Sequence, residues 1–219
     1  MARLAAWTTT RTRLIALIMG WFGAVLVGAT VCGELLKRAE RPDGSTAFDS
    51  SITSWMVAHR TSAWTTLAHG LSTAGSQKVL IPLVGVAVLA LIVRRRFVPA
   101  ALLVVGWGGA TLLYSLIKYF VHRPRPPSDI WLADVGKSTS FPSGHATQSL
   151  ASYLALALVG ATWLSKPAWR GCALALVLAG GVGWSRVYLG VHWTTDVIAG
   201  WLIAAAWTTV IFAAGRRHL

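Results

Sequence analysis

Long apolar runs separated by short polar segments occupy most of this chain. Several runs approach the roughly 20 residues that an α-helix needs to cross the hydrocarbon core of a bilayer. Six runs account for about half of the 219 residues, so we predict an all-α integral membrane bundle that forms a single domain over residues 1–219. The six predicted membrane helices are Leu14–Cys32, Val79–Val93, Phe97–Ile117, Ala146–Leu164, Gly171–Val187 and Val197–Ala214.

The polar segment Gly33–Lys78 carries apolar residues at three- and four-residue spacing, which is typical of amphipathic helices. We predict one short helix with Asp49 as its cap and a second that stops at Gly75. The pattern is equally compatible with helices that lie on the outer leaflet and with a cap packed on the bundle. The positions that carry it are Ile52, Trp55, Met56, His59, Trp64, Leu67 and Leu71.

A second polar segment, Lys118–His145, connects two of the predicted membrane helices. Its prolines at 124, 126 and 127 forbid a regular helix, because proline lacks the backbone donor and restricts the residue before it. The segment ends in a polar stretch with Gly136 and three hydroxyl residues, which predicts a flexible entry into the next helix.

The composition excludes an ordinary soluble domain: 55% of residues are hydrophobic, 12% are charged, and the mean hydropathy is +0.59. The net charge of +13 suggests nucleic acid binding at first sight. However, the basic residues come in short clusters at the ends of apolar runs and form no long basic face. We therefore predict a membrane partner and no nucleic acid partner.

The distribution of charge predicts the topology. Basic clusters lie at alternate ends of the apolar runs, and the positive-inside rule places such clusters in the cytoplasm. We predict a multi-pass protein of the cytoplasmic membrane with both termini inside. The predicted inner clusters are Arg3, Arg11 and Arg13, then Arg94, Arg95 and Arg96, then Lys166 and Arg170, then Arg216 and Arg217; all seven acids, Glu34, Glu40, Asp43, Asp49, Asp129, Asp134 and Asp196, fall on the outer side.

Three short stretches at the ends of apolar runs hold residues suited to phosphate chemistry. In the first, Lys118 offers a point charge, and Arg125 offers a planar fork that can grip two phosphate oxygens. Taken alone, these two residues are more simply interpreted as membrane anchors whose charged ends reach the interface.

The second stretch, Pro142-Ser143-Gly144-His145, opens the fourth predicted membrane helix. Ser143 is a candidate N-cap, and Gly144 lets backbone N–H groups approach an anion at the positive end of the helix dipole. His145 is placed to protonate a leaving oxygen. An ordinary cap followed by an interfacial histidine fits the same residues equally well.

The third stretch combines Arg186 with His192 and Asp196. Arg186 interrupts an apolar half-span, where charge is costly and usually functional. His192 and Asp196 are four residues apart, so we predict that they share one helix face and that the carboxylate orients a nucleophilic imidazole. The alternative is a buried pair that only ties helices together.

His145, His192 and Asp196 are also of the types that bind zinc. Lys118, Arg125 and Arg186 are predicted to converge on the same place, where fixed positive charge repels a dication and attracts an anion. We therefore predict no metal and no cofactor.

Taken together, the three stretches resemble the three-part signature of the type 2 phosphatidic acid phosphatases, also called lipid phosphate phosphatases, over roughly residues 49–200. The resemblance implies that His192 attacks phosphorus and forms a phosphohistidine, that Asp196 orients it, and that His145 protonates the leaving group. It implies no metal, and it leaves Arg123 as a candidate accessory phosphate contact. The residues it implies for holding phosphoryl oxygens are Lys118, Arg125, Ser143, Gly144 and Arg186.

The expected function is metal-independent removal of phosphate from a membrane lipid phosphate or pyrophosphate at the outer membrane face. The candidate substrates are a prenyl pyrophosphate, phosphatidic acid and phosphatidylglycerophosphate. Two alternatives stay open, which are a lipid-linked phosphotransferase and a non-catalytic membrane protein that binds lipid phosphates. Generic apolar side chains recognise a lipid tail without a readable code, so the sequence predicts neither the tail nor the oligomeric state.

Overall fold

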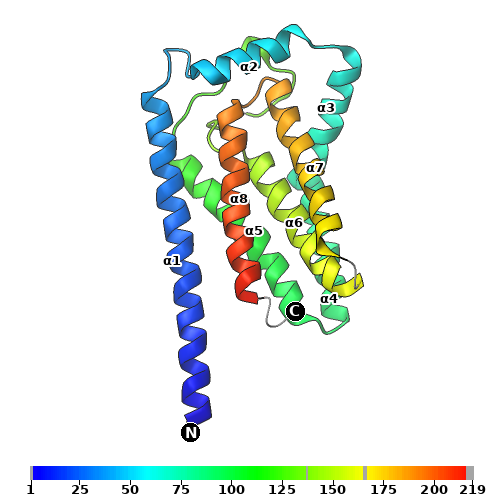
Figure 1. The fold of residues 1–219 in the computed structure, drawn as a ribbon. Helices are drawn as coiled ribbons and strands as arrows, with labels where there is room; N and C mark the ends of the chain where they lie inside the picture. Colours follow the sequence, from blue (N-terminus) through cyan, green and yellow to red (C-terminus); the bar gives the residue numbers. More distant parts are fainter. Residues whose placement is uncertain (1, 137, 165–166, 216–219) are drawn as a thin grey trace.

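A computed structural model describes residues 2–136, 138–164 and 167–215, and within these ranges the chain is helical with no β-strand. The all-α prediction is therefore confirmed. The long helices run side by side, and α2 lies across one end of them (Figure 1). The elements are α1 (Ala2–Arg38), α2 (Ala47–Ala58), α3 (Ser62–Ala74), α4 (Gln77–Val93), α5 (Phe97–Phe120), the 3-10 helix η1 (Ser128–Ile130), α6 (Gly144–Leu164), α7 (Ala168–Tyr188) and α8 (Thr194–Gly215).

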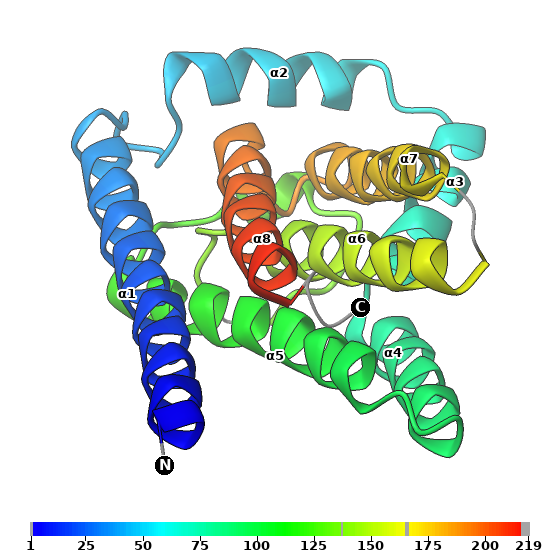
Figure 2. The ribbon, with the colours of Figure 1, turned by 60° about the horizontal axis from the view of Figure 1, so that its bottom comes forward.

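Helix α6 is the centre of the bundle, packed against α5, α7 and α8, whereas α1 lies at the edge against α5 and α8 (Figure 2). The core joins buried apolar side chains of α5, α6 and α8, such as Leu113, Ala151 and Trp207. Gly109 is required for the close approach of α5 to α8, because a Cβ there would lie 2.4 Å from the indole ring of Trp207.

Four helices in the described ranges are long and apolar enough to cross a bilayer. They correspond to the first, third, fifth and sixth predicted spans. The second span appears as α4, which has 17 residues and follows α3 at a bend of 43°, so the two together are long enough for one broken span. The four are Thr12–Arg38, Phe97–Phe120, Ala168–Tyr188 and Thr194–Gly215.

The fourth predicted span, α6, is not among these four, because polar residues crowd its first half. Thr147, Gln148, Ser149 and Ser152 are all buried. Neighbouring helices pack against α6, so these polar side chains face protein and not lipid, and polar groups are tolerated in such protein-facing positions. The number of six membrane crossings stays a prediction.

The two short helices of the first polar segment exist, but the structure corrects two details. The N-cap of α2 is Thr46, whose hydroxyl accepts from the backbone N–H of Asp49, so Asp49 is the third residue of the helix and not its cap. Only α2 lies across the end of the bundle, whereas α3 packs along α7 and bends into α4. Gly75 ends α3 as predicted.

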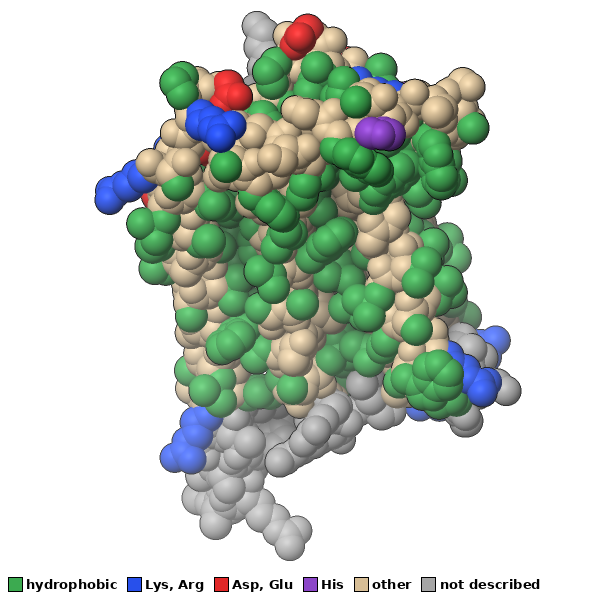
Figure 3. Space-filling view, turned by 45° about the horizontal axis from the view of Figure 1, so that its top comes forward, with side chains coloured by type: hydrophobic (Ala, Val, Ile, Leu, Met, Phe, Trp, Pro, Cys, Tyr) green, Lys and Arg blue, Asp and Glu red, His purple; other side chains and the backbone are tan. Residues whose placement is uncertain are grey.

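The two ends of the bundle differ in charge. All seven acidic residues belong to the end covered by α2, and the visible acidic side chains gather there (Figure 3). The turn with Arg94, Arg95 and Arg96 lies at the other end, where α1 begins and α8 ends. Between the ends runs a belt of apolar side chains. Lys166, Arg216 and Arg217 of the predicted inner clusters lie outside the described residues.

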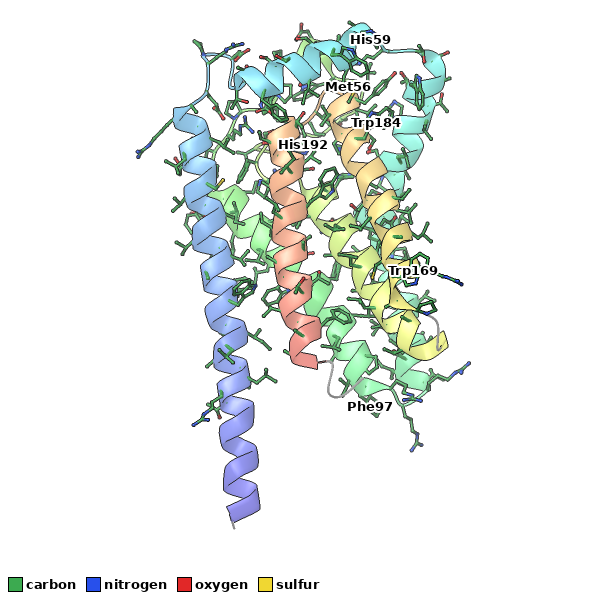
Figure 4. All side chains as sticks on the ribbon, in the orientation of Figure 1. Met56, His59, Phe97, Trp169, Trp184 and His192 are labelled. Atoms are coloured by element: carbon green, nitrogen blue, oxygen red, sulfur yellow. The ribbon has the colours of Figure 1, made fainter. Side chains whose placement is uncertain are left out.

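Exposed aromatic and long apolar side chains mark both ends of this belt. Trp169 and Phe97 lie at the end opposite α2 (Figure 4) and are 66% and 62% exposed. Trp55 is 58% exposed on α2. Such girdles are typical of the two membrane–water interfaces. The bundle is thus suited to a bilayer whose outer or inner surface lies at the level of α2.

Candidate functional site

The three signature stretches meet beneath α2, although they lie far apart in sequence. Lys118 is in the last turn of α5, His145 in the first turn of α6, and Arg186 in the last turn of α7. The turn between α7 and α8 carries His192 (Figure 4). His192 lies close enough to Arg125, Lys118, Arg186 and His145 for their charges to act on it.

His192 and Asp196 are paired in the buried floor of the site. The imidazole Nδ1 is 3.3 Å from Oδ2 of Asp196, and neither side chain is more than 4% exposed. A carboxylate at Nδ1 favours the tautomer that carries its proton there, which leaves the lone pair on Nε2. Burial lowers the pKa of His192 well below its ordinary value, and the cations of Arg125 and Lys118 lower it further, so the ring is neutral.

The pairing was predicted correctly, but the two residues do not share one helix. His192 lies in the turn before α8, and Asp196 is the third residue of that helix. The carboxylate reaches back to accept from the backbone N–H of Trp193 at 2.9 Å, which is half of a capping box, and it thereby meets the imidazole. Ser140 also donates to the same oxygen, Oδ2.

The guanidinium group of Arg125 lies beside Nε2 of His192, the ring nitrogen that does not face Asp196. Its Nη1 is 3.2 Å from Nε2 of His192 and donates to the carbonyl of Val191. Its Nε and Nη2 donate to the carbonyl and hydroxyl of Ser138, each at 2.8 Å. These contacts fix the fork beside the lone pair that would attack an electrophile.

Lys118 links the end of α5 to the segment that enters α6. Its ammonium group donates to the carbonyl oxygens of Thr139 and Ser140, the second at 3.3 Å. An ammonium has three donors, so one remains for a ligand after these two contacts.

The start of α6 is capped as the sequence predicts. Ser143 accepts at its carbonyl from the backbone N–H of Thr147, and its hydroxyl lies 3.5 Å from the backbone nitrogen of Ala146. Its own N–H donates to the carbonyl of Asp196, which ties α6 to α8. At Gly144 a Cβ would lie 3.1 Å from the ring of Tyr114, so a side chain here would crowd this helix start.

Arg186 is 3% exposed, and its guanidinium is not fully hydrogen-bonded. Its Nη1 donates to the hydroxyl of Ser72 at 2.5 Å, but its buried Nε has no hydrogen-bond partner. A buried donor of a charged group without an acceptor is costly, and an anion in the site relieves that cost. Its charge also acts on His145, which is within electrostatic reach of both Arg186 and Arg125.

Arg123 does not occupy the place expected of an accessory phosphate contact. Its side chain is fully buried, and its guanidinium donates to the carboxylates of Glu40, Asp49 and Asp196. The sequence suggested a phosphate role because Arg123-Pro124 repeats the motif of Arg125-Pro126. The structure shows that one arginine of the pair faces the imidazole and the other faces the acids.

Sequence reasoning missed Asp49 as part of the site. Asp49 is fully buried, and its two oxygens accept from the backbone N–H and the hydroxyl of Thr195, at 2.9 and 2.8 Å. Two features of the sequence hinted at this contact: Asp49 is an acidic residue in a predicted amphipathic helix, and a second arginine, Arg123, lies next to the signature residue Arg125. These features do not show which of the seven acids Arg123 contacts.

The described residues contain no cluster of three or more His, Cys, Asp or Glu side chains arranged to hold a metal ion. Asp196 illustrates why these residues fit a metal poorly. Its Oδ1 accepts from Arg123, and its Oδ2 accepts from Ser140, Trp193 and His192, so its lone pairs are engaged.

A pocket of about 470 Å³ opens beside Arg125 on the loop side of the site. Its walls come from the proline-rich stretch 122–128 and from residues 131, 136, 138 and 139. This volume is in the range of small-molecule sites and lies next to the guanidinium fork.

The fold and the site define a class of protein: an all-α membrane bundle with a carboxylate-paired histidine beside fixed cations at one membrane surface. The chain belongs to the PAP2 superfamily, whose family model matches residues 99–218. This confirms the resemblance to the type 2 phosphatidic acid phosphatases.

Two curated relatives each match about 60% of the chain. An undecaprenyl-diphosphatase of Sulfolobus acidocaldarius is 34% identical over 139 residues, covering 62% of this chain and 63% of the relative. Phosphatidylglycerophosphatase B of Bacillus subtilis is 32% identical over 134 residues, covering 60% of this chain and 65% of the relative. The match therefore spans less than two thirds of the length of either relative.

A solved structure extends the likeness over more of the chain. The crystal structure of a transmembrane PAP2-type phosphatidylglycerolphosphate phosphatase from Bacillus subtilis has a TM-score of 0.76 and 26% sequence identity. The comparison covers 88% of this chain and 96% of the solved one. The arrangement of the helices is thus shared far beyond the three signature stretches.

Proposed function

We propose that this chain is a phosphatase that releases phosphate from a membrane lipid phosphate or pyrophosphate through a phosphohistidine at His192. The observation that carries the proposal is the placement of the imidazole. Its Nδ1 is held by Asp196, and its Nε2 faces the guanidinium of Arg125 at 3.2 Å. A neutral nucleophile thus points to where an anion would be gripped.

The first chemical step follows from this geometry. The Nε2 lone pair of His192 attacks phosphorus, and the bond from phosphorus to the oxygen of the lipid breaks. His145 gives a proton to that leaving oxygen, while Asp196 stabilises the positive charge on the imidazole. Lys118, Arg125, Arg186 and the helix start at Ser143–Gly144 hold the three remaining phosphoryl oxygens.

The second step returns the enzyme. His145, now neutral, takes a proton from water, and the resulting oxygen attacks phosphorus and breaks the phosphorus–nitrogen bond. Inorganic phosphate leaves, and His192 is neutral again. Every charge in the site that stabilises this chemistry is a fixed side chain, so no metal is required.

The names of the two relatives support both substrate classes, a prenyl pyrophosphate and phosphatidylglycerophosphate. The purified protein is expected to release phosphate from at least one member of a panel with these two lipids and phosphatidic acid, with EDTA present throughout. Colorimetric detection of phosphate and chromatography of the lipid product measure the reaction.

Each failure on this panel has a distinct meaning. Product formation only with an added alcohol acceptor would indicate the phosphotransferase, and tight lipid binding without product would indicate the non-catalytic binder. Loss of activity in EDTA that zinc or magnesium restores would contradict the metal-free chemistry.

We also propose that both termini are cytoplasmic and that the site opens at the outer membrane surface. The end with the site holds every acidic residue, whereas the turn at residues 94–96 carries three arginines. The positive-inside rule assigns that basic turn to the cytoplasm. Lipid substrates would then enter from the outer leaflet beneath α2.

Single cysteines test this orientation without removing a charge. Ser128 on η1 and Ala168 at the start of α7 are exposed at opposite ends of the bundle. In a variant lacking Cys32 and Cys172, Ser128→Cys is expected to react with a membrane-impermeant thiol reagent in intact cells, and Ala168→Cys only after lysis. The reverse pattern would place the site at the cytoplasmic face.

A further inference from the structure

Arg123 has no part in the proposed chemical steps, but it is the centre of a buried ion cluster. The guanidinium Nε lies 2.5 Å from Glu40, Nη2 lies 2.8 Å from Asp49, and Nη1 lies 2.7 Å from Asp196. Each nitrogen therefore meets a different carboxylate. All of its donor directions are directed at protein acceptors, so it has no fork to offer to a phosphate.

The three carboxylates come from three separate parts of the chain. Glu40 lies in the turn after α1, Asp49 on α2, and Asp196 on α8. Thr195 links Arg123 to Asp49, because its hydroxyl lies 2.6 Å from Nη1 of Arg123 and 2.8 Å from Oδ2 of Asp49. The helix that caps the site is thereby joined through Arg123 to Asp196, the residue that holds the nucleophile.

The two oxygens of Asp196 have different partners. Oδ1 accepts from Arg123, whereas Oδ2 lies against Nδ1 of His192. Ser140 and the backbone N–H of Trp193 also donate to Oδ2. The planar guanidinium at Oδ1 acts together with these two donors to fix the direction of the contact that selects the tautomer of His192.

Several charged groups surround Asp196, and Arg123 is the cation that contacts it directly. Lys118 and Arg125 also attract this carboxylate from α5 and the proline-rich loop, and Glu40 repels it. Burial lowers the pKa of Arg123, but Asp196 and Asp49 outweigh that effect and raise it. Burial raises the pKa of Glu40, against the opposing influence of Arg123. Arg123 therefore remains charged beside Asp196.

We propose that Arg123 is a positioning residue that keeps Asp196 turned toward His192, with Glu40, Asp49 and Thr195 holding the guanidinium in place. This inference rests on the proposed function of His192 as the nucleophile. Arg123 touches no reacting atom, and it acts on the reaction only through the carboxylate. The repeated Arg-Pro pair then separates two tasks, since Arg125 faces the phosphate and Arg123 faces the acid.

The test is the pH dependence of kcat in Arg123→Gln. Loss of a cation beside the His192–Asp196 pair favours protonation of the His192 imidazole, so the acid limb of the profile is expected to move up by about one pH unit or more. At neutral pH kcat is expected to fall by about 10²-fold or more, because a misdirected triad carboxylate costs that much. KM is expected to change little, since the phosphate contacts remain.

Glu40→Gln is the matched variant with the opposite expected sign. The amide oxygen can still accept from Nε of Arg123, because Glu40 uses only one oxygen in that contact. Removal of a negative charge from this cluster disfavours protonation of the His192 imidazole, so the acid limb is expected to move down. A cluster that merely stabilised the fold would lower the amount of active protein in both variants without moving the limbs apart.

Arg123→Lys covers the case in which Arg123→Gln does not fold. Lysine keeps the charge and loses the fork, so the acid limb is expected to stay near that of the wild type while kcat falls. If either Arg123 variant folds with wild-type kcat, or if Arg123→Gln and Glu40→Gln shift the acid limb in the same direction, the inference is wrong.

Binding of orthovanadate separates this inference from the proposed function, because it needs no turnover. Vanadate is a trigonal phosphate mimic that bonds to the attacking imidazole, and its affinity is expected to drop in Arg123→Gln or Arg123→Lys but not in Glu40→Gln. A wild-type protein inactive on every lipid would contradict the proposed function. Equal vanadate affinity in wild type and the Arg123 variants would contradict the positioning role alone.

Discussion

Replacement of His192 by alanine is expected to lower lipid phosphate turnover by about 10⁴-fold or more, since loss of a nucleophile disables the whole catalytic unit. The variant should still fold, because the His192 ring contacts Asp196 and Arg125 within the site and lies in a turn between helices. Phosphate release from purified protein measures the effect, and thermal unfolding checks the fold.

His69→Ala is the matched control, because His69 is exposed on α3 and belongs to no part of the site. It is expected to keep wild-type activity. If His192→Ala kept more than a small fraction of wild-type turnover while His69→Ala behaved normally, the nucleophile would have to be another group.

Replacement of His145 by alanine is expected to have an effect that depends on the leaving group. General acid catalysis contributes about 10²- to 10⁴-fold when the leaving group is a poor one, and the alkoxide of phosphatidic acid is strongly basic. A prenyl pyrophosphate expels a phosphate, which is a much weaker base and needs less protonation. The expected loss is therefore large for phosphatidic acid and small for the pyrophosphate.

The quantity to compare is kcat/KM, which reports the steps up to formation of the phosphohistidine. The later attack of water needs His145 for both substrates and would obscure the difference in kcat. Equal losses of kcat/KM on the two substrates would remove His145 from the role of general acid.

The sequence could predict the pairing of His192 with Asp196, because a spacing of four residues keeps two side chains close in almost any helical context. It could not predict that His192 precedes α8, because this depends on where the helix begins. The capping contact between the Asp196 carboxylate and the backbone N–H of Trp193 marks that start, and it is visible only in the structure. Charge alternation predicted that the acids gather at one end. The same pattern could not reveal that three of them share Arg123.

Hydropathy predicted the outward-facing helices better than the central one. α1 and α5 face lipid over much of their length, so their side chains are apolar and the pattern is strong. α6 is surrounded by protein and carries buried polar residues such as Gln148 and Ser152, which weaken the signal. Hydropathy also failed to predict that α3 and α4 form one bent pair, because α3 is amphipathic and α4 is short by itself.

The roles of Arg123 and Arg125 show where local sequence stops being informative. Both arginines precede a proline, and both lie two residues apart in one stiff loop. Only the fold decides that one turns inward to Asp49 and Asp196 while the other reaches His192. The motif assigns the expected phosphate contact to Arg125 by its position, whereas the contacts of Arg123 follow only from the three-dimensional structure.

Trapping of the covalent intermediate tests the central claim most directly. The protein is mixed with a lipid phosphate labelled at its terminal phosphorus, quenched in alkali, and digested for mass spectrometry. We expect label that is stable in base and labile in acid, located on His192 and absent from His192→Ala. Label on another residue, or label that persists in His192→Ala, would contradict the account.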